Sequence, residues 1–243
     1  MKIKELIQLK QKNLWQGKPI TIVCIGDSVT QGCFEPRFTS KTTVEPVFDY
    51  KSAYATRLKE ILNILYPSVQ FNVINSGISG DNTEWAKGRF DRDVMSYNPD
   101  LVIISFGLND SHKGLEKLQN YEDNLAEMFE KVKGKGIDCI FLTQNMMTTK
   151  TEPQMVEEFL MDFQREVAAN IQNSGILTKY FESAKKVCEK YSVKVCDMYD
   201  IWQKLYLLGV DITELLANKS NHPIREFHYY IAIKLIETIF SLN

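Results

Sequence analysis

Five short apolar segments constrain this chain more than any other feature of its sequence. They cover residues 20–25, 71–74, 101–106, 137–142 and, more weakly, 193–196. Each has the length of a β-strand and is rich in β-branched or aromatic residues, which favour extended backbone. The segments are apolar throughout rather than alternating, a pattern typical of strands that are covered on both faces.

Amphipathic helical patterns separate these segments. Apolar residues recur every three or four positions before Pro67 and again before Gly134, so each helix has one buried stripe. The two stripes comprise Ala53, Leu58, Ile61, Leu62 and Leu65, then Leu115, Leu118, Leu125, Phe129 and Val132. Strands that alternate with helices imply right-handed crossovers and a parallel sheet with helices on both faces. We therefore predict an α/β fold with one doubly wound domain.

Further helices are expected at both ends of the chain and in one long segment. An amphipathic helix is predicted within about residues 1–16, and another over residues 223–240. Residues 151–191 are longer than a crossover needs, and they predict two helices, 153–173 and 176–191, separated at Ser174-Gly175. No Pro- or Ser-rich linker isolates this segment. We predict that residues 1–243 form a single domain in which about 151–191 are a helical elaboration.

Composition excludes several kinds of partner. The chain has 243 residues, with 29 Lys and Arg against 31 Asp and Glu, and thus a formal net charge of −2. Binding to nucleic acid or to a membrane surface usually needs a basic excess, so neither partner is expected. Five cysteines without metal-type spacing, and a charged segment at residues 1–12, favour the reducing cytoplasm. The sequence leaves homo-oligomerisation open.

Small and polar residues directly follow each of the first four apolar segments. In an open parallel sheet, ligands bind beyond the carboxyl ends of the strands, where these stretches converge. The stretches are Gly26-Asp27-Ser28-Val29-Thr30-Gln31-Gly32, Asn75-Ser76-Gly77-Ile78-Ser79-Gly80-Asp81, Gly107-Leu108-Asn109-Asp110 and Thr143-Gln144-Asn145.

These stretches contain the parts that nucleophilic acyl transfer needs: a hydroxyl, and donors for the developing oxyanion. Ser28 is expected at a strand-to-helix turn, where backbone N–H groups are free. Gly77 can present its N–H closely because it has no side chain, and Asn109 offers an amide NH₂. We predict Ser28 as the nucleophile, and the N–H groups of Ser28 and Gly77 with the Asn109 amide as the oxyanion hole.

The base must come from the three histidines of the chain, His112, His222 and His228. His222 lies in Asn221-His222-Pro223 before the last predicted helix, where Pro223 at the first helical position leaves the imidazole in the loop. His228 falls inside the helical pattern, and His112 is close enough to the third polar stretch to line a pocket. His222 is the predicted base.

Several of these residues also have ordinary structural interpretations. Ser28 could cap the following helix, and Asn109 could belong to a loop cap. Gly77 could be a turn glycine with positive φ, which is compatible with the oxyanion role. Asp27 and Met146 could border the pocket, with turn stabilisation and core filling as their alternatives.

The order and spacing of these residues resemble the SGNH hydrolases, the family of GDSL-type esterases and lipases. Gly26-Asp27-Ser28 is similar to the first block with its nucleophile, Gly77 to the second, Gly107-Leu108-Asn109-Asp110 to the third, and His222 to the base of the last. The resemblance implies a flavodoxin-like three-layer α/β/α sandwich with a five-stranded parallel sheet. It also implies ester hydrolysis through an acyl-serine intermediate, with neither a cofactor nor a metal ion.

One position departs from the family pattern. The family usually has an aspartate three residues before the base, and here that position is Lys219, with Asn218 beside it. Replacing the orienting carboxylate by an amide costs a serine protease about 10⁴ in turnover. We hypothesise that either a backbone carbonyl or the Asn218 side-chain oxygen accepts the His222 Nδ1–H, giving a Ser–His dyad.

The sequence thus predicts a serine esterase whose partner is a small-molecule ester. Within the family, residues 26–32 and 221–223 are most similar to the carbohydrate-esterase and small-ester branch, which implies a short-chain, acetyl ester on a carbohydrate. One alternative is a lysophospholipase or acyl-thioesterase of the same fold. The other is a catalytically weak carbohydrate-binding protein that has lost its triad.

Overall fold

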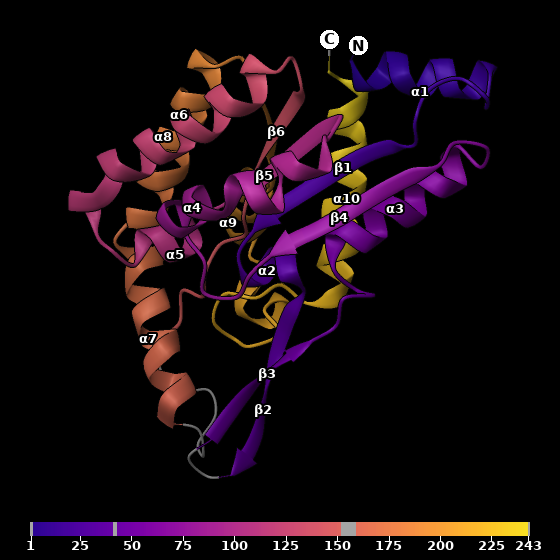
Figure 1. The fold of residues 1–243 in the computed structure, drawn as a ribbon. Coiled ribbons are helices and arrows are strands. Elements are labelled where there is room, and N and C mark those ends of the chain that lie inside the picture. Colours follow the sequence, from indigo (N-terminus) through magenta and orange to yellow (C-terminus); the bar gives the residue numbers. More distant parts are fainter. Residues whose placement is uncertain (1, 41–42, 152–158, 243) are drawn as a thin grey trace.

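A computed structural model describes residues 2–40, 43–151 and 159–242. Its main sheet has five parallel strands in the order β4-β1-β5-β6-β7 (Figure 1). The strands are β1 (Ile20–Gly26), β4 (Phe71–Gly77), β5 (Leu101–Ser105), β6 (Asp138–Thr143) and β7 (Lys194–Asp197). Each of the five apolar segments forms one of these strands. The predicted sheet is therefore confirmed, and its strand order is the flavodoxin-like one.

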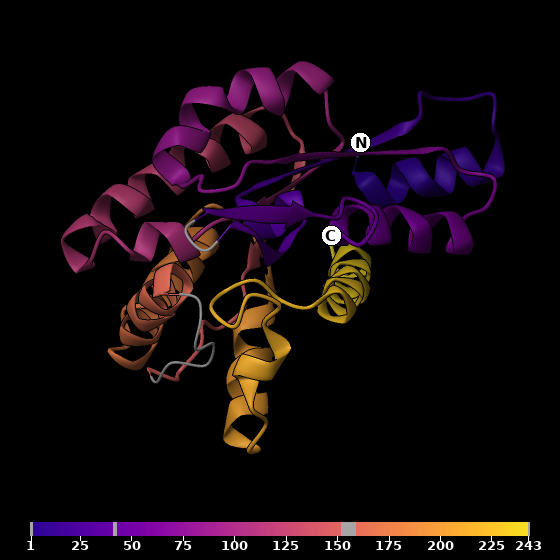
Figure 2. The ribbon, with the colours of Figure 1, turned by 90° about the horizontal axis from the view of Figure 1, so that it is seen from below.

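Helices cover both faces of this sheet, as a three-layer α/β/α sandwich requires (Figure 2). One face packs on α1 (Ile3–Lys12), α3 (Tyr54–Leu65) and α10 (Arg225–Phe240). The opposite face packs on α4 (Thr83–Asp93), α6 (Leu118–Gly134), α7 (Phe159–Asn173) and α8 (Ile176–Lys190). At the β7 edge lies α9 (Met198–Leu207). Its Met198 packs into the core that contains α10, and its Trp202 packs into the core that contains α4.

Side chains of the central strands alternate between these two cores. In β1, Ile22 and Cys24 face the core with α10, whereas Val23 and Ile25 face the core with α4. All residues of β1, β5 and β6 are buried, while the edge strand β4 is buried only in part. Burial on both faces explains why the central segments are predominantly apolar rather than alternating.

The predicted elaboration and the predicted last helix both correspond to helices of the structure. The elaboration at about residues 151–191 contains α7 and α8, and the predicted helical residues 153–158 lie outside the described residues. The last helix begins at Arg225, whereas Pro223 pairs with Leu216 in an isolated antiparallel bridge. The prediction that Pro223 occupies the first helical position is therefore wrong.

An antiparallel hairpin of β2 (Cys33–Ser40) and β3 (Thr43–Phe48) was not predicted. It projects from the end of the sheet where α2 (Ser28–Gln31) lies (Figure 1). Both of its strands contain a proline, Pro36 and Pro46, which pair with each other. Proline cannot donate to a strand ladder, so its presence argues against a strand in a sequence pattern. The hairpin matters for function because it carries Phe34.

Gly77 at the end of β4 packs directly on the backbone of α2. A Cβ at this position would lie 2.3 Å from the Gln31 nitrogen and 2.7 Å from the Thr30 carbonyl carbon. Only glycine permits backbones to approach so closely. The missing side chain of Gly77 thus lets the turn that contains Ser28 lie against the end of β4.

Gly77→Ala is expected to lower the free energy of unfolding by about 1–3 kcal/mol, because backbone atoms of α2 must move to accept the methyl group. Gly88→Ala in α4 is a matched control, since its added Cβ meets nothing within 4 Å. Alanine is about 1 kcal/mol more favourable than glycine in a helix interior, so this variant should be more stable. Urea unfolding measures both changes, and equal stability of the two variants would contradict the tight packing at Gly77.

Candidate active site

Ser28 is the first residue of α2 and lies two residues after the end of the buried strand β1. Asp27 precedes it as the N-cap, and its Oδ1 accepts the Val29 N–H at 3.0 Å. A Cβ at Gly26 would lie 2.1 Å from Thr30 Oγ1 and 2.7 Å from the Ser105 carbonyl oxygen, so the chain can turn this tightly only at a glycine. The sequence Gly26-Asp27-Ser28 therefore builds a sharp, capped turn that holds the Ser28 hydroxyl at the carboxyl edge of the sheet.

His222 lies beside Ser28 although 194 residues separate them in the sequence. Its Nε2 is 2.9 Å from Ser28 Oγ, and its Nδ1 is 3.0 Å from the carbonyl oxygen of Phe34. Because a carbonyl can only accept, Nδ1 carries the proton and donates it to Phe34. The Nε2 lone pair then faces the Ser28 hydroxyl, which is the tautomer that a general base needs.

The environment of His222 keeps the imidazole neutral. Burial lowers its pKa below the ordinary value, and the hydrogen bond to the Phe34 carbonyl acts in the opposite direction. A neutral imidazole at neutral pH is able to take a proton from Ser28.

Asn218 holds the loop that carries His222 rather than the imidazole itself. Its Oδ1 accepts the backbone N–H groups of Ser220, Asn221 and His222 at 3.1, 2.9 and 2.9 Å. Of the two partners hypothesised for the ring, the structure places the backbone carbonyl at Nδ1. Asn218 acts on the ring only through the backbone of residue 222.

Lys219 stands where the family has an aspartate, and its side chain is engaged elsewhere. Its backbone is left-handed, with φ 53°, and its Nζ pairs with Glu214 Oε2 at 2.7 Å. The same loop is attached to the stretch that follows β6, because Asn145 Nδ2 donates to the Asn221 carbonyl at 2.8 Å. The His222 loop is therefore shaped by Asn218 and anchored by Asn145.

Two of the proposed oxyanion donors follow strands on either side of β1, Gly77 at the end of β4 and Asn109 after β5. Gly77 is paired in register with Gly26, but its N–H donates to Asn75 Oδ1 at 3.0 Å. Asn109 lies in α5 (Leu108–Ser111), and its Nδ2 donates to the Asp81 carbonyl at 2.8 Å. An amide nitrogen carries two hydrogens, so Asn109 retains a second donor.

Gln144 connects the Ser28 turn to the Asn109 turn, a role that sequence reasoning missed. Its Nε2 donates to Asp27 Oδ2 at 2.8 Å, and its Oε1 accepts the Leu108 N–H at 3.0 Å. Gln144 and Asp27 are both buried, and burial raises the pKa of Asp27 to about 7 although its hydrogen bonds oppose this. Gln144 does occupy the polar stretch after the fourth apolar segment, but its position alone does not reveal what it bonds to.

The remaining candidate residues comprise three buried side chains and one exposed one. Asp27 is buried under the turn, with hydrogen bonds to both carboxylate oxygens. Met146 is buried in the core on the α4 side of the sheet, and His112 is exposed at the end of α5. His228 is fully buried, and its Nδ1 accepts the Tyr54 N–H at 3.1 Å.

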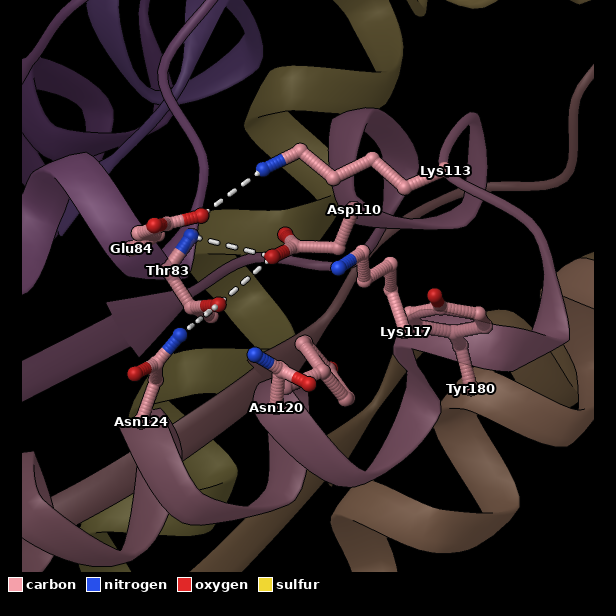
Figure 3. Close-up of a pocket in the computed structure, with 9 residues that line it drawn as sticks. Thr83, Glu84, Asp110, Lys113, Lys117, Asn120, Asn124 and Tyr180 are labelled. Carbon is pink, nitrogen blue, oxygen red and sulfur yellow. Dashed lines mark hydrogen bonds and ion pairs between the residues drawn. The ribbon is translucent and has the colours of Figure 1, made fainter.

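A small polar pocket lies beside the Asn109 turn, between α4, α5 and α6 (Figure 3). At its wall Asp110 Oδ1 accepts the N–H and the hydroxyl of Thr83, and Asn124 donates to the same hydroxyl. Neither Ser28 nor His222 lines this pocket. Burial raises the pKa of Asp110 to about 6. The position of Asp110 indicates that it anchors the start of α4 next to the candidate site.

Within 2–40, 43–151 and 159–242, no group of three or more His, Cys, Asp or Glu side chains is arranged to hold a metal ion. In the same part of the chain, none of the helices is both long and apolar enough to cross a membrane.

A doubly wound sheet with a Ser–His pair at its carboxyl edge is an arrangement suited to nucleophilic acyl transfer. The chain belongs to the GDSL-like lipase/acylhydrolase family, whose model matches residues 24–223. This match confirms the resemblance drawn from the four sequence blocks, and it spans Ser28, Gly77, Asn109 and His222.

Individual relatives are similar over shorter stretches. An acetylxylan esterase of Geobacillus stearothermophilus is 32% identical over 89 residues, which cover 37% of this chain and 39% of the relative. An uncharacterised lipoprotein, YqeF, of Bacillus subtilis is 30% identical over 129 residues, 50% of this chain and 47% of the relative. The matched stretches thus span less than half the length of either curated relative.

Solved structures resemble the whole fold. The crystal structure of an acetylxylan esterase from Geobacillus stearothermophilus has a TM-score of 0.66 at 21% identity, covering 92% of this chain and 95% of the other. A two-domain esterase active on acetylated mannans has a TM-score of 0.66 at 16% identity, covering 98% of this chain and 52% of the other. At these identities the similarity establishes the shared fold.

Asn218→Ala is expected to lower kcat about 10- to 100-fold, because three N–H groups lose their acceptor and the imidazole moves away from Ser28. Asn218→Asp keeps an oxygen in the same place and should retain most of the activity, so it serves as the matched variant. Steady-state kinetics on a p-nitrophenyl ester measures both. Unchanged turnover in Asn218→Ala would show that the loop holds its shape without this side chain.

Proposed function

We propose that this protein is a serine esterase that hydrolyses short-chain, acetyl esters of a carbohydrate through an acyl-serine intermediate. The observation that carries the proposal is the geometry of His222, with Nε2 2.9 Å from Ser28 Oγ and Nδ1 3.0 Å from the Phe34 carbonyl. This geometry provides a nucleophile, a base and an orienting acceptor in one hydrogen-bonded row.

In the proposed reaction, His222 Nε2 takes the Ser28 proton while Oγ attacks the ester carbonyl carbon. The oxyanion binds to the N–H groups of Ser28 and Gly77 and to the Asn109 amide. For this role the Gly77 N–H must be shared with Asn75, its present acceptor. The imidazolium returns its proton to the leaving alcohol, and His222 then activates a water molecule that releases the acid and restores Ser28.

A neutral substrate is supported by the charges around the His222 loop. The two cations nearest to His222 in the sequence are both paired with carboxylates, Lys219 with Glu214 and Arg225 with Glu35 and Asp49. A paired cation offers little attraction to a phosphorylated or CoA-linked acyl group. The acetyl and carbohydrate parts of the proposal are supported by the relatives, which include an acetylxylan esterase and an esterase active on acetylated mannans.

A reducing compartment such as the cytoplasm is also part of the proposal. All five cysteines are buried and unpaired in the structure. Burial raises the pKa of Cys24, Cys139 and Cys196, so these thiols are poorly reactive.

Labelling with a fluorophosphonate tests the acyl-serine chemistry directly. The wild-type protein should be labelled at Ser28, and Ser28→Ala should lose both the label and at least about 10³-fold in turnover, since it removes the nucleophile. Absence of labelling together with measurable binding of an acetylated or free sugar would instead favour a carbohydrate-binding protein without catalysis.

The acyl length of the substrate is tested with p-nitrophenyl acetate and p-nitrophenyl octanoate. The proposal expects kcat/KM to be at least about tenfold higher for acetate, a difference of roughly 1.4 kcal/mol in transition-state binding. A preference for octanoate would contradict the acetyl assignment and favour a lysophospholipase or acyl-thioesterase. Acetylated xylose or mannose oligomers then test the alcohol half of the ester.

A further inference from the structure

The carbonyl that orients His222 belongs to a distant segment of the chain. Phe34 lies in β2 of the projecting hairpin, 188 residues before His222 in the sequence. A backbone carbonyl on such a hairpin is useful to the base only if the hairpin is held in place. The structure therefore needs contacts that fix Phe34 relative to the His222 loop.

Arg225 makes these contacts from the start of α10, three residues after His222. Its Nη1 and Nη2 donate to the two carboxylate oxygens of Glu35 at 2.8 and 3.0 Å, and its Nε donates to Asp49 at 2.9 Å. Glu35 directly follows Phe34 in β2, while Asp49 directly follows β3. One guanidinium thus binds both strands of the hairpin where they leave the body of the protein.

Arg225 also contacts Phe34 itself. The guanidinium carbon lies 4.4 Å from the centre of the Phe34 ring, a cation–π distance. The same buried ring packs against His228, with ring centres 4.7 Å apart. Phe34 is therefore held through its side chain by two residues of α10, so its carbonyl has little freedom to move away from His222.

We propose that Arg225, together with Glu35 and Asp49, is a positioning residue that fixes the Phe34 carbonyl on His222 Nδ1 and so keeps the base in its reactive orientation. The proposal rests on the esterase function and adds the group that replaces the missing aspartate. In this arrangement the ring bonds to a backbone carbonyl oxygen and not to a carboxylate. Arg225 and the carboxylates of Glu35 and Asp49 hold that carbonyl oxygen in place.

Arginine suits this role for a geometric reason. Its planar fork can donate two parallel bonds to one carboxylate and a third bond to another, while its face covers an aromatic ring. Lysine carries the same charge but has neither the fork nor the flat face. Hydrogen bonds from Arg225 also hold the pKa of Glu35 below its usual range, so the pair stays ionised at neutral pH.

Arg225→Lys is the decisive variant, because it keeps the charge beside His222 while it removes the fork. The variant leaves unchanged the two carboxylate partners of Arg225, Glu35 and Asp49, and also His228, whose charge interacts with that of His222. The expected result is a kcat about 10- to 100-fold lower, the cost of misplacing a catalytic group by about 1 Å. KM should stay within about twofold, since no substrate contact is removed.

A second readout does not depend on activity. Losing the hydrogen bond to the Phe34 carbonyl should lower the pKa of His222, because this bond favours the protonated ring. Titration of the histidine resonances by NMR measures this shift, with His222→Ala for the assignment. A merely structural role for Arg225 would lower the unfolding temperature without moving the pKa of His222 in the folded protein.

Arg37→Lys is the matched control, because Arg37 pairs with Glu45 across the same hairpin at 2.6 Å, with both side chains exposed. It should leave kcat and the His222 pKa unchanged. If Arg225→Lys leaves both kcat and the pKa of His222 at their wild-type values, the proposal is overturned. If the wild-type protein is neither labelled nor active but the pKa shift still appears, the esterase function fails while the positioning role stands.

Discussion

The hydrogen bond between His222 Nδ1 and the Phe34 carbonyl is the interaction on which the candidate site depends. It selects the imidazole tautomer with a free Nε2, and that nitrogen is 2.9 Å from Ser28 Oγ. A carbonyl dipole stabilises a developing imidazolium less than a carboxylate does, so the arrangement relies on orientation more than on charge. Orientation in turn depends on how the hairpin and the His222 loop are held.

Those two segments are held by buried or partly buried polar contacts whose geometry is specific. Asn218 satisfies three backbone N–H groups of the His222 loop, and Arg225 joins both strands of the hairpin to α10. Beneath Ser28, Gln144 links the turn at Asp27 to the turn at Leu108. A buried polar group without a partner costs about 1–3 kcal/mol, so such contacts fix one arrangement of the loops rather than several.

Much of this architecture could be predicted because it follows from local pattern. The five apolar segments became the five strands of one sheet, and the polar residues after them converge at its carboxyl edge. The hairpin could not be predicted, because Pro36 and Pro46 weaken the strand pattern on both sides. The start of the last helix was misplaced for a related reason: Pro223 suits a first helical position, but it is extended here and pairs with Leu216.

The sequence by itself determined the parallel sheet and the turn that carries Ser28, because apolar segments and turn residues are patterns of residues close together in the chain. It also singled out His222 among three histidines as the expected base, and folding brings that ring to 2.9 Å from Ser28 Oγ across 194 residues. Only the tertiary structure decided what orients His222. The sequence left a backbone carbonyl and the Asn218 oxygen open, and the structure places the carbonyl of Phe34 at the ring and Asn218 on the loop backbone. Every residue has a backbone carbonyl, so no residue type in the sequence reveals which carbonyl accepts the His222 Nδ1–H. The contact exists only because folding brings β2 against the start of α10.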